Sequence, residues 1–147
     1  MRVMGINKAT AITEAGVMPS QELLAGMGAL MQEMVEAGVL LGGEGLKSSK
    51  YGLRISGKGG EVITDGPFAE TKELIAGFAI MNVKSMDEAV EWGRRMIEVI
   101  ERADPQQAGT VELELRPLAE PDDFGEEFTP ELREAEERLK EQIGQTY

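Results

Sequence analysis

The segment LIAGFAIMNV, residues 74–83, constrains the fold more than any other stretch of the chain. All of its residues except Asn82 are apolar or small. A short, continuous apolar run that contains a glycine, here Gly77, is more typical of a fully buried strand than of a helix. We therefore predict a central strand of a sheet over residues 74–83.

The N-terminal third predicts a strand followed by a helix. The apolar run MRVMGI at residues 1–6 predicts a second central strand. From Ser20 onward the apolar residues recur with the 3.6-residue period of a helix, with Ser20 as N-cap and Gly38 at the position that follows the C-terminus. The next stretch, VLLGGEGLKSS, is rich in glycine, and we interpret it as a connection.

The rest of the chain continues the alternation of strands and helices. YGLRIS and EVIT, separated by glycines, predict a β-hairpin over residues 51–64. Ser85 and Glu88 form a capping box that opens a second helix. TVELELR, residues 110–116, alternates apolar and charged residues as a strand with two unlike faces does, and Thr129-Pro130 opens a tail helix that extends to about residue 143.

This order, β-α-β-(β)-β-α-β with a tail helix, predicts an α+β ferredoxin-like βαββαβ sandwich with an inserted hairpin. We expect one domain over residues 1–117. Residues 118–147 form an acidic linker and helix, with ten acids against three bases. The predicted apolar face of the tail helix, Leu132, Leu139 and Ile143, should dock on the body of the protein or on a partner subunit.

In a sandwich of this kind the helices cover only one face of the sheet. The alternation in residues 110–116 places Glu112, Glu114 and Arg116 on the bare face. A large apolar sheet face is normally covered by something. We therefore expect a second copy of the chain to pack on it, which gives a homodimer with a cavity between the two sheets.

Composition excludes several classes of function. The chain has no cysteine and no histidine, so disulfides, thiolate chemistry and histidine-dependent catalysis are closed to it. The net charge of −12 argues against nucleic acid as a partner. The chain contains no stretch of about 18 apolar residues, so the sequence predicts no membrane span. We expect a cytoplasmic protein without a cofactor or a bound metal.

Three stretches carry a resemblance to a known family. They are GGEGL at residues 42–46, LRISGKGGEVITDGPFAETKE at residues 53–73 and the Gly77-Phe78 pair of AGFAI. Over roughly residues 1–117 the chain resembles the DGPF subgroup of the YCII-related proteins. The resemblance implies a ferredoxin-like domain that dimerises sheet to sheet as a dimeric α/β barrel, and most members have no assigned activity.

The same resemblance bears on catalysis. In some relatives of the wider family a His-Asp pair lies in a cleft and is thought to act as acid and base. This chain has no histidine, so it can match only the aspartate of the pair, and Asp65 is the candidate. That departure weakens the transfer of an enzymatic activity to this chain.

Asp65, in the segment TDGPFAETKE, has two interpretations that can hold together. Its carboxylate can accept backbone N–H groups in an Asx-turn before Pro67. It can also lie at the rim of a cleft, held by Arg54 or Lys72. We further expect Phe68 to anchor the segment by burying its ring.

The other candidate ligand-binding residues carry charges with two interpretations each. Glu70 and Lys72 form either a solvated cluster or part of an anion-binding pocket. Arg54, Glu112 and Glu114 share the bare face if the neighbours of Arg54 pack under the helices. There they either form ion pairs that fix the dimer or bind a ligand.

Two functions follow from these observations. The first is a non-catalytic small-molecule-binding or regulatory module that uses the cavity between the sheets. DGPF-type members are often linked with alternative sigma factors, which agrees with regulation. The alternative is a cofactor-free lyase or isomerase with Asp65 as acid and base. The absence of histidine favours the first, and whether there is any catalysis stays open.

Overall fold

The computed structural model describes residues 1–59, 61–65 and 73–144, and its centre is a four-stranded antiparallel sheet in the order β2-β5-β1-β6. The strands are β1 (Arg2–Lys8), β2 (Leu40–Gly45), β5 (Ile75–Asn82) and β6 (Leu113–Pro117). The apolar run at residues 74–83 is thus an inner strand, as predicted. β1 lies beside it, paired from Arg2–Asn82 to Lys8–Ile75.

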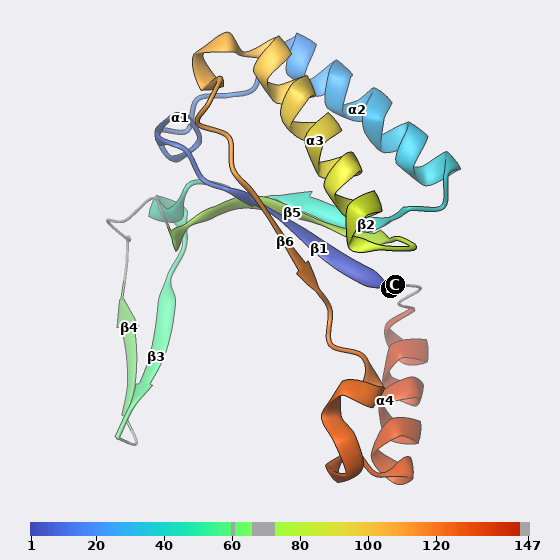
Figure 1. Cartoon of the computed structure of the whole chain (residues 1–147). Coiled ribbons are helices and arrows are strands. Elements are labelled where there is room, and N and C mark those ends of the chain that lie inside the picture. The colour runs from blue at the N-terminus through green and yellow to red at the C-terminus, as the bar shows by residue number, and fades with distance from the viewer. Residues whose placement is uncertain (60, 66–72, 145–147) are drawn as a thin grey trace.

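Two long helices, α2 (Gln21–Glu36) and α3 (Met86–Ala103), lie together over one face of the sheet (Figure 1). Each begins at a serine whose hydroxyl accepts a backbone N–H bond, Ser20 from Leu23 at 3.1 Å and Ser85 from Glu88 at 3.2 Å. The core lies between helices and sheet. Its buried apolar residues are Val3, Leu30, Met34, Val39, Met81, Val83, Ala89 and Met96.

The second strand of the sheet corrects the sequence interpretation, which took residues 39–49 as a connection. β2 lies in this glycine-rich stretch and pairs with β5. The pairing requires a glycine at one position of each strand, Gly43 of β2 and Gly77 of β5. A Cβ on Gly43 would lie 2.6 Å from the carbonyl oxygen of Phe78, and one on Gly77 would lie 2.8 Å from that of Glu44. The residues typical of a loop therefore permit the close approach of two strands.

The hairpin is present, but it stands apart from the main sheet. β3 (Arg54–Lys58) and β4 (Glu61–Asp65) form a separate two-stranded sheet that projects away from the body (Figure 1). Leu53 and Ile55 are 72% and 70% exposed, so they do not pack under the helices. The condition that would have placed Arg54 on the bare face of the main sheet is therefore not met.

Three short helical turns were not predicted from the sequence. They are α1 (Ala11–Glu14) after β1, the 3₁₀ turn η1 (Ser49–Tyr51) after β2, and the 3₁₀ turn η3 (Pro105–Gln107) after α3. All three follow the ends of major elements, and they form the walls of the pocket described below.

The tail contains a 3₁₀ segment, η4 (Pro121–Glu127), and the predicted helix, α4 (Pro130–Ile143). Arg133 holds α4 against η4 through Asp122 Oδ1 at 2.8 Å and the Pro121 carbonyl at 3.0 Å. The apolar face points outward instead, with Leu139 57% and Ile143 65% exposed. The prediction that this face docks on the body of the same chain is therefore wrong. The alternative, that it docks on a partner subunit, stays a prediction.

The face of the sheet opposite α2 and α3 carries alternate residues of each strand. Leu113 and Leu115 contact Gly93 of α3, so Glu114 and Arg116 point to the other face, as the alternation predicted. There the pairing brings Ile6 beside Phe78 and Glu114. Among the described residues, no helix has both the length and the apolar character needed to cross a membrane.

Candidate functional site

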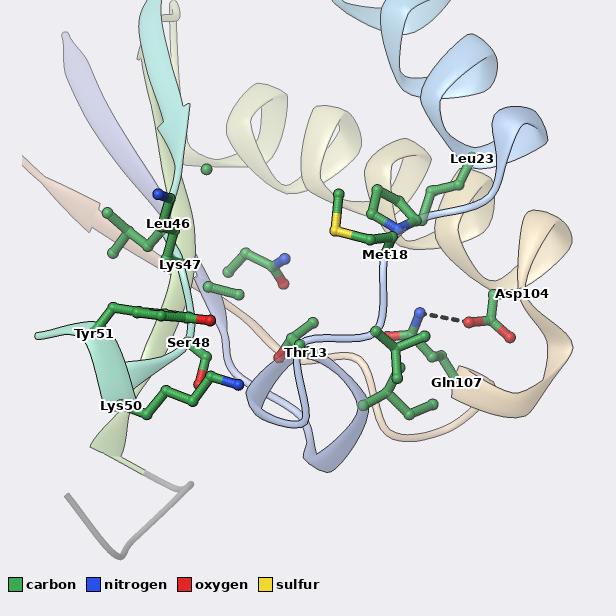
Figure 2. A pocket seen from close by; sticks show the side chains of 17 residues that line it. Thr13, Met18, Leu23, Leu46, Lys47, Ser48, Lys50, Tyr51, Asp104 and Gln107 are labelled. Carbon is green, nitrogen blue, oxygen red and sulfur yellow. Dashed lines mark hydrogen bonds between the residues drawn. The ribbon is translucent and has the colours of Figure 1, made fainter. Parts of the chain in front are cut away.

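A pocket of about 650 Å³ lies at one end of the sheet (Figure 2). It opens where α1 and the loop after it face the end of β2, η1 and η3. The lining residues are Asn7, Ile12, Thr13, Gly16, Val17, Met18, Pro19, Leu23, Gly45, Leu46, Lys47, Ser48, Lys50, Tyr51, Ala76, Asp104 and Gln107.

The wall formed by α1 and η1 is held by a dense set of hydrogen bonds. Ser49 donates from its backbone N (3.2 Å) and its hydroxyl (2.6 Å) to the carboxylate of Glu14. The hydroxyl of buried Ser48 donates to the Glu14 carbonyl at 2.8 Å. Thr10 and Thr13 form a reciprocal capping box at the start of α1. These bonds fix two loops far apart in the sequence, so the wall is formed before any ligand arrives.

On this wall, η1 and the residues just before it carry two lysines beside an aromatic ring. The ammonium groups of Lys47 and Lys50 lie 5.9 Å and 5.0 Å from the ring centroid of Tyr51. Figure 2 shows Lys50 and Tyr51 on the same wall of the pocket. At this distance a cation is attracted to the face of the ring, which restrains both side chains. Neither lysine forms an ion pair with a described carboxylate.

The opposite wall comes from the end of α3. The side-chain amide of Gln107 donates to Asp104 Oδ2 at 2.9 Å, shown as a dashed line in Figure 2. Asp104 Oδ1 accepts from the backbone N–H of Gln106 at 3.2 Å, which caps η3. Gln107 is 6% exposed. This wall therefore presents fixed polar groups across from the lysines.

A second pocket of about 360 Å³ lies between the sheet and the long helices. It shares Asn7, Gly45 and Ala76 with the first pocket. Its roof is formed by methionines of α2 and α3, among them Met27 and Met96. Methionine side chains adapt to the shape of what they contact. The two pockets together offer a polar entrance and an apolar interior, which suits a small amphipathic molecule.

Of the predicted site residues, the structure describes Arg54, Glu112 and Glu114, and the backbone of Asp65; the first and last lie in the hairpin and the other two lie at β6. Arg54 and Asp65 face each other as backbone partners in the β3–β4 hairpin. Glu114 belongs to the edge strand of the main sheet, where it lies 3.6 Å from Lys8 and 3.8 Å from Arg116. Glu112 immediately precedes that strand, and its carbonyl accepts the backbone N–H of Lys8.

Several predictions in the TDGPFAETKE segment concern atoms outside the described part of the chain. The predictions on Phe68, Glu70 and Lys72, and on the Asx-turn before Pro67, fall on undescribed residues. For Asp65 the structure describes the backbone, as the last residue of β4, but not the side chain. The structure does not test these predictions.

Sequence reasoning missed the lysines and the tyrosine of the pocket. A signal was present, since the string KSSKY places two bases and an aromatic side by side in a chain of net charge −12. What the sequence could not supply is the far wall, because Asp104 and Gln107 come from a distant segment.

Comparison with known proteins confirms the YCII-related part of the resemblance seen in the sequence. A family model described as the YCII-related domain matches residues 1–110. An uncharacterized protein of Rhizobium meliloti (strain 1021) is 33% identical over 100 residues, which cover 67% of this chain and 75% of that protein. The family match spans β1, β2 and β5, both long helices and every described residue that lines the larger pocket. The chain belongs to the YCII-related domain family.

Proposed function

We propose that this protein is a small-molecule-binding module whose ligand occupies the larger pocket, the one walled by α1, η1 and η3. The observation that carries the proposal is the preformed wall in which Glu14 binds both Ser48 and Ser49. Walls fixed in advance lower the entropy lost when a ligand binds. A volume of about 650 Å³ lies within the usual range for small-molecule sites.

The proposal includes a homodimer of ferredoxin-like sandwiches of the DGPF type. The strand order β2-β5-β1-β6 with both long helices on one face supports the sandwich. Half-buried Met4, Ile6 and Phe78 on the other face support a covering partner. The cavity between two sheets, where the sequence placed the ligand, requires that partner. Within one chain the described pockets lie at the end of the sheet and on its helix side, so the proposal places the ligand there.

The alternative, a cofactor-free lyase or isomerase with Asp65 as acid and base, stays a second proposal with less support. It requires a carboxylate within reach of the ligand. Among the described residues that line the larger pocket, none belongs to the β3–β4 hairpin, and the side chain of Asp65 lies outside the described part of the chain.

The binding proposal is tested by filling the pocket. Gly45 lines both pockets, and a Cβ there would meet no atom within 4 Å. Gly45→Phe should therefore fold and occupy the space. The neutral fluorescent probe N-phenyl-1-naphthylamine should bind the wild type in a saturable way and bind Gly45→Phe at least about tenfold more weakly, a loss of about 1.4 kcal/mol.

Gly28→Phe is the matched control. Gly28 lies in α2 outside both pockets, and a Cβ there also meets nothing within 4 Å. This variant should bind the probe as the wild type does. Equal binding by all three proteins would show that the probe occupies some other site and would refute the proposal.

A further inference from the structure

One wall of the larger pocket carries two positive charges, on a strongly acidic protein. The chain has 27 acids and 15 bases. Most of the described lysines and arginines lie beside carboxylates, for example Arg2 beside Glu120 and Arg94 beside Glu91. Lys47 and Lys50 instead lie against the Tyr51 ring, with no described carboxylate within 4.0 Å. Their charge is therefore available to a ligand.

The nearby acid, Glu14, forms no ion pair with either lysine and is not among the described residues that line the pocket. Glu14, on the adjacent α1, directs its carboxylate to the backbone N–H and hydroxyl of Ser49. On the far wall the two carboxylate oxygens of Asp104 accept from Gln106 and Gln107. The lysine wall and the Asp104 wall thus give the pocket two unlike ends. A negative group is attracted at the first and repelled at the second.

Much of the remaining lining of the pocket is apolar. Ile12, Val17, Leu23 and Leu46 line it, and Ala76 continues it into the second pocket beneath the methionines of α2 and α3. A ligand that uses the whole site therefore needs an apolar body attached to its charged group. A dianion with charges at both ends would place one of them beside Asp104.

We infer that the ligand is an organic monoanion, a carboxylate or an equivalent singly charged group on an apolar, ring-sized or short-chain body, with its charge at the wall that carries Lys47 and Lys50. This inference rests on the proposed binding function and names the class of molecule bound. The ammonium groups hold the anion, Tyr51 keeps them in place, and the apolar interior takes the body.

The test compares two fluorescent probes of similar size, one anionic and one neutral. 1-Anilinonaphthalene-8-sulfonate is a monoanion, and N-phenyl-1-naphthylamine has the same rings without the charge. Each is titrated into the wild type, the double variant Lys47→Gln/Lys50→Gln, and the control Lys84→Gln. Lys84 is exposed and lies outside the pockets.

We expect the double variant to bind the anionic probe at least about fivefold more weakly, as loss of an exposed charge pair implies. Its affinity for the neutral probe should stay within about twofold of the wild type. Lys84→Gln should change neither. Raising the ionic strength from about 0.05 to about 0.5 M should weaken the binding of the anionic probe alone, because salt screens exposed charges.

The possible failures are distinct. If the neutral probe binds in a way that Gly45→Phe abolishes, but the anionic probe is indifferent to the two lysines, the site exists and the inference about charge is wrong. The inference is also wrong if both probes weaken equally in the double variant, since the lysines would then act through the fold. If neither probe binds the wild type, the proposed function fails together with the inference.

Discussion

At the residue scale, one ion pair fastens the tail to the sheet. Arg2 of β1 donates two hydrogen bonds of 2.9 Å to the two carboxylate oxygens of Glu120. This contact holds the pKa of Glu120 below its ordinary value of 4.5 and raises that of Arg2. Both groups are partly exposed to solvent, so screening limits what the pair contributes.

The pair predicts a pH dependence. A carboxyl group whose pKa is lower in the folded state stabilises the fold above the unfolded pKa, and the contribution disappears as the pH falls through the folded pKa. Arg2→Gln should therefore lower the free energy of unfolding by up to about 1 kcal/mol at neutral pH. The difference from the wild type should shrink as the pH falls below 4.5.

Urea denaturation at several pH values measures this difference. Arg116→Gln is the control, because Arg116 is 70% exposed and lies 3.8 Å from Glu114. It should cost less than Arg2→Gln at neutral pH. A difference between Arg2→Gln and the wild type that stays constant down to about pH 2 would show that the guanidinium acts through packing alone.

At the scale of elements, strands with a clear apolar pattern could be predicted and the glycine-rich strand could not. The run at residues 74–83 and the alternation at 110–116 report burial directly, and the structure confirms both as strands. β2 has glycine at Gly42, Gly43 and Gly45, so few side chains remain to show a pattern. It is a strand because it pairs with β5, where the backbone of Phe78 and Ala79 approaches Gly43 too closely for a side chain.

This explanation predicts that Gly43→Ala destabilises the sheet. The new Cβ would lie 2.6 Å from the backbone oxygen of Phe78, and a backbone atom cannot move aside as a flexible side chain can. We expect a loss of about 1–3 kcal/mol in the free energy of unfolding, the usual cost of overpacking. Gly45→Ala, in the same strand but with open space around its Cβ, should cost clearly less.

Chemical denaturation of the two alanine variants measures the contrast. Equal midpoints for Gly43→Ala and Gly45→Ala would mean that the close approach of β2 and β5 does not limit side-chain size there.

The candidate site was less predictable than the elements for a physical reason. Lys47, Lys50 and Tyr51 lie close together in the sequence, in or just before η1, and their charge and aromatic character can be read there. Their role as one wall depends on Glu14 binding Ser49 across 35 positions. The predicted site residues Arg54 and Glu114 were linked through an assumed strand assignment. That link fails because the hairpin forms a sheet of its own.

At the scale of the whole molecule, the proposal predicts a homodimer through the face of the sheet opposite the helices. Ile6 lies on this face between its backbone partners Phe78 and Glu114. Ile6→Lys places a charge in the proposed interface while Glu114 offers it a counter-charge within the chain. We expect light scattering at micromolar concentration to report a dimer for the wild type and a monomer for this variant.

Val90→Lys provides the comparison on the other side of the molecule. Val90 is 54% exposed on α3, and this variant should remain dimeric. Circular dichroism confirms that each variant is folded. A wild-type protein that is monomeric at micromolar concentration would remove the dimer and the cavity between sheets, and it would leave the larger pocket unaffected.

The central claim, that a small molecule binds at the end of the sheet, is tested most directly by nuclear magnetic resonance. The backbone amides of the isotope-labelled full chain are followed while N-phenyl-1-naphthylamine is added. We predict saturable shifts that cluster at Thr13, Gly45, Ser48 and Tyr51, with a single dissociation constant. Shifts that cluster instead at Met4, Ile6 and Phe78 would place the ligand on the opposite face of the sheet and contradict the account.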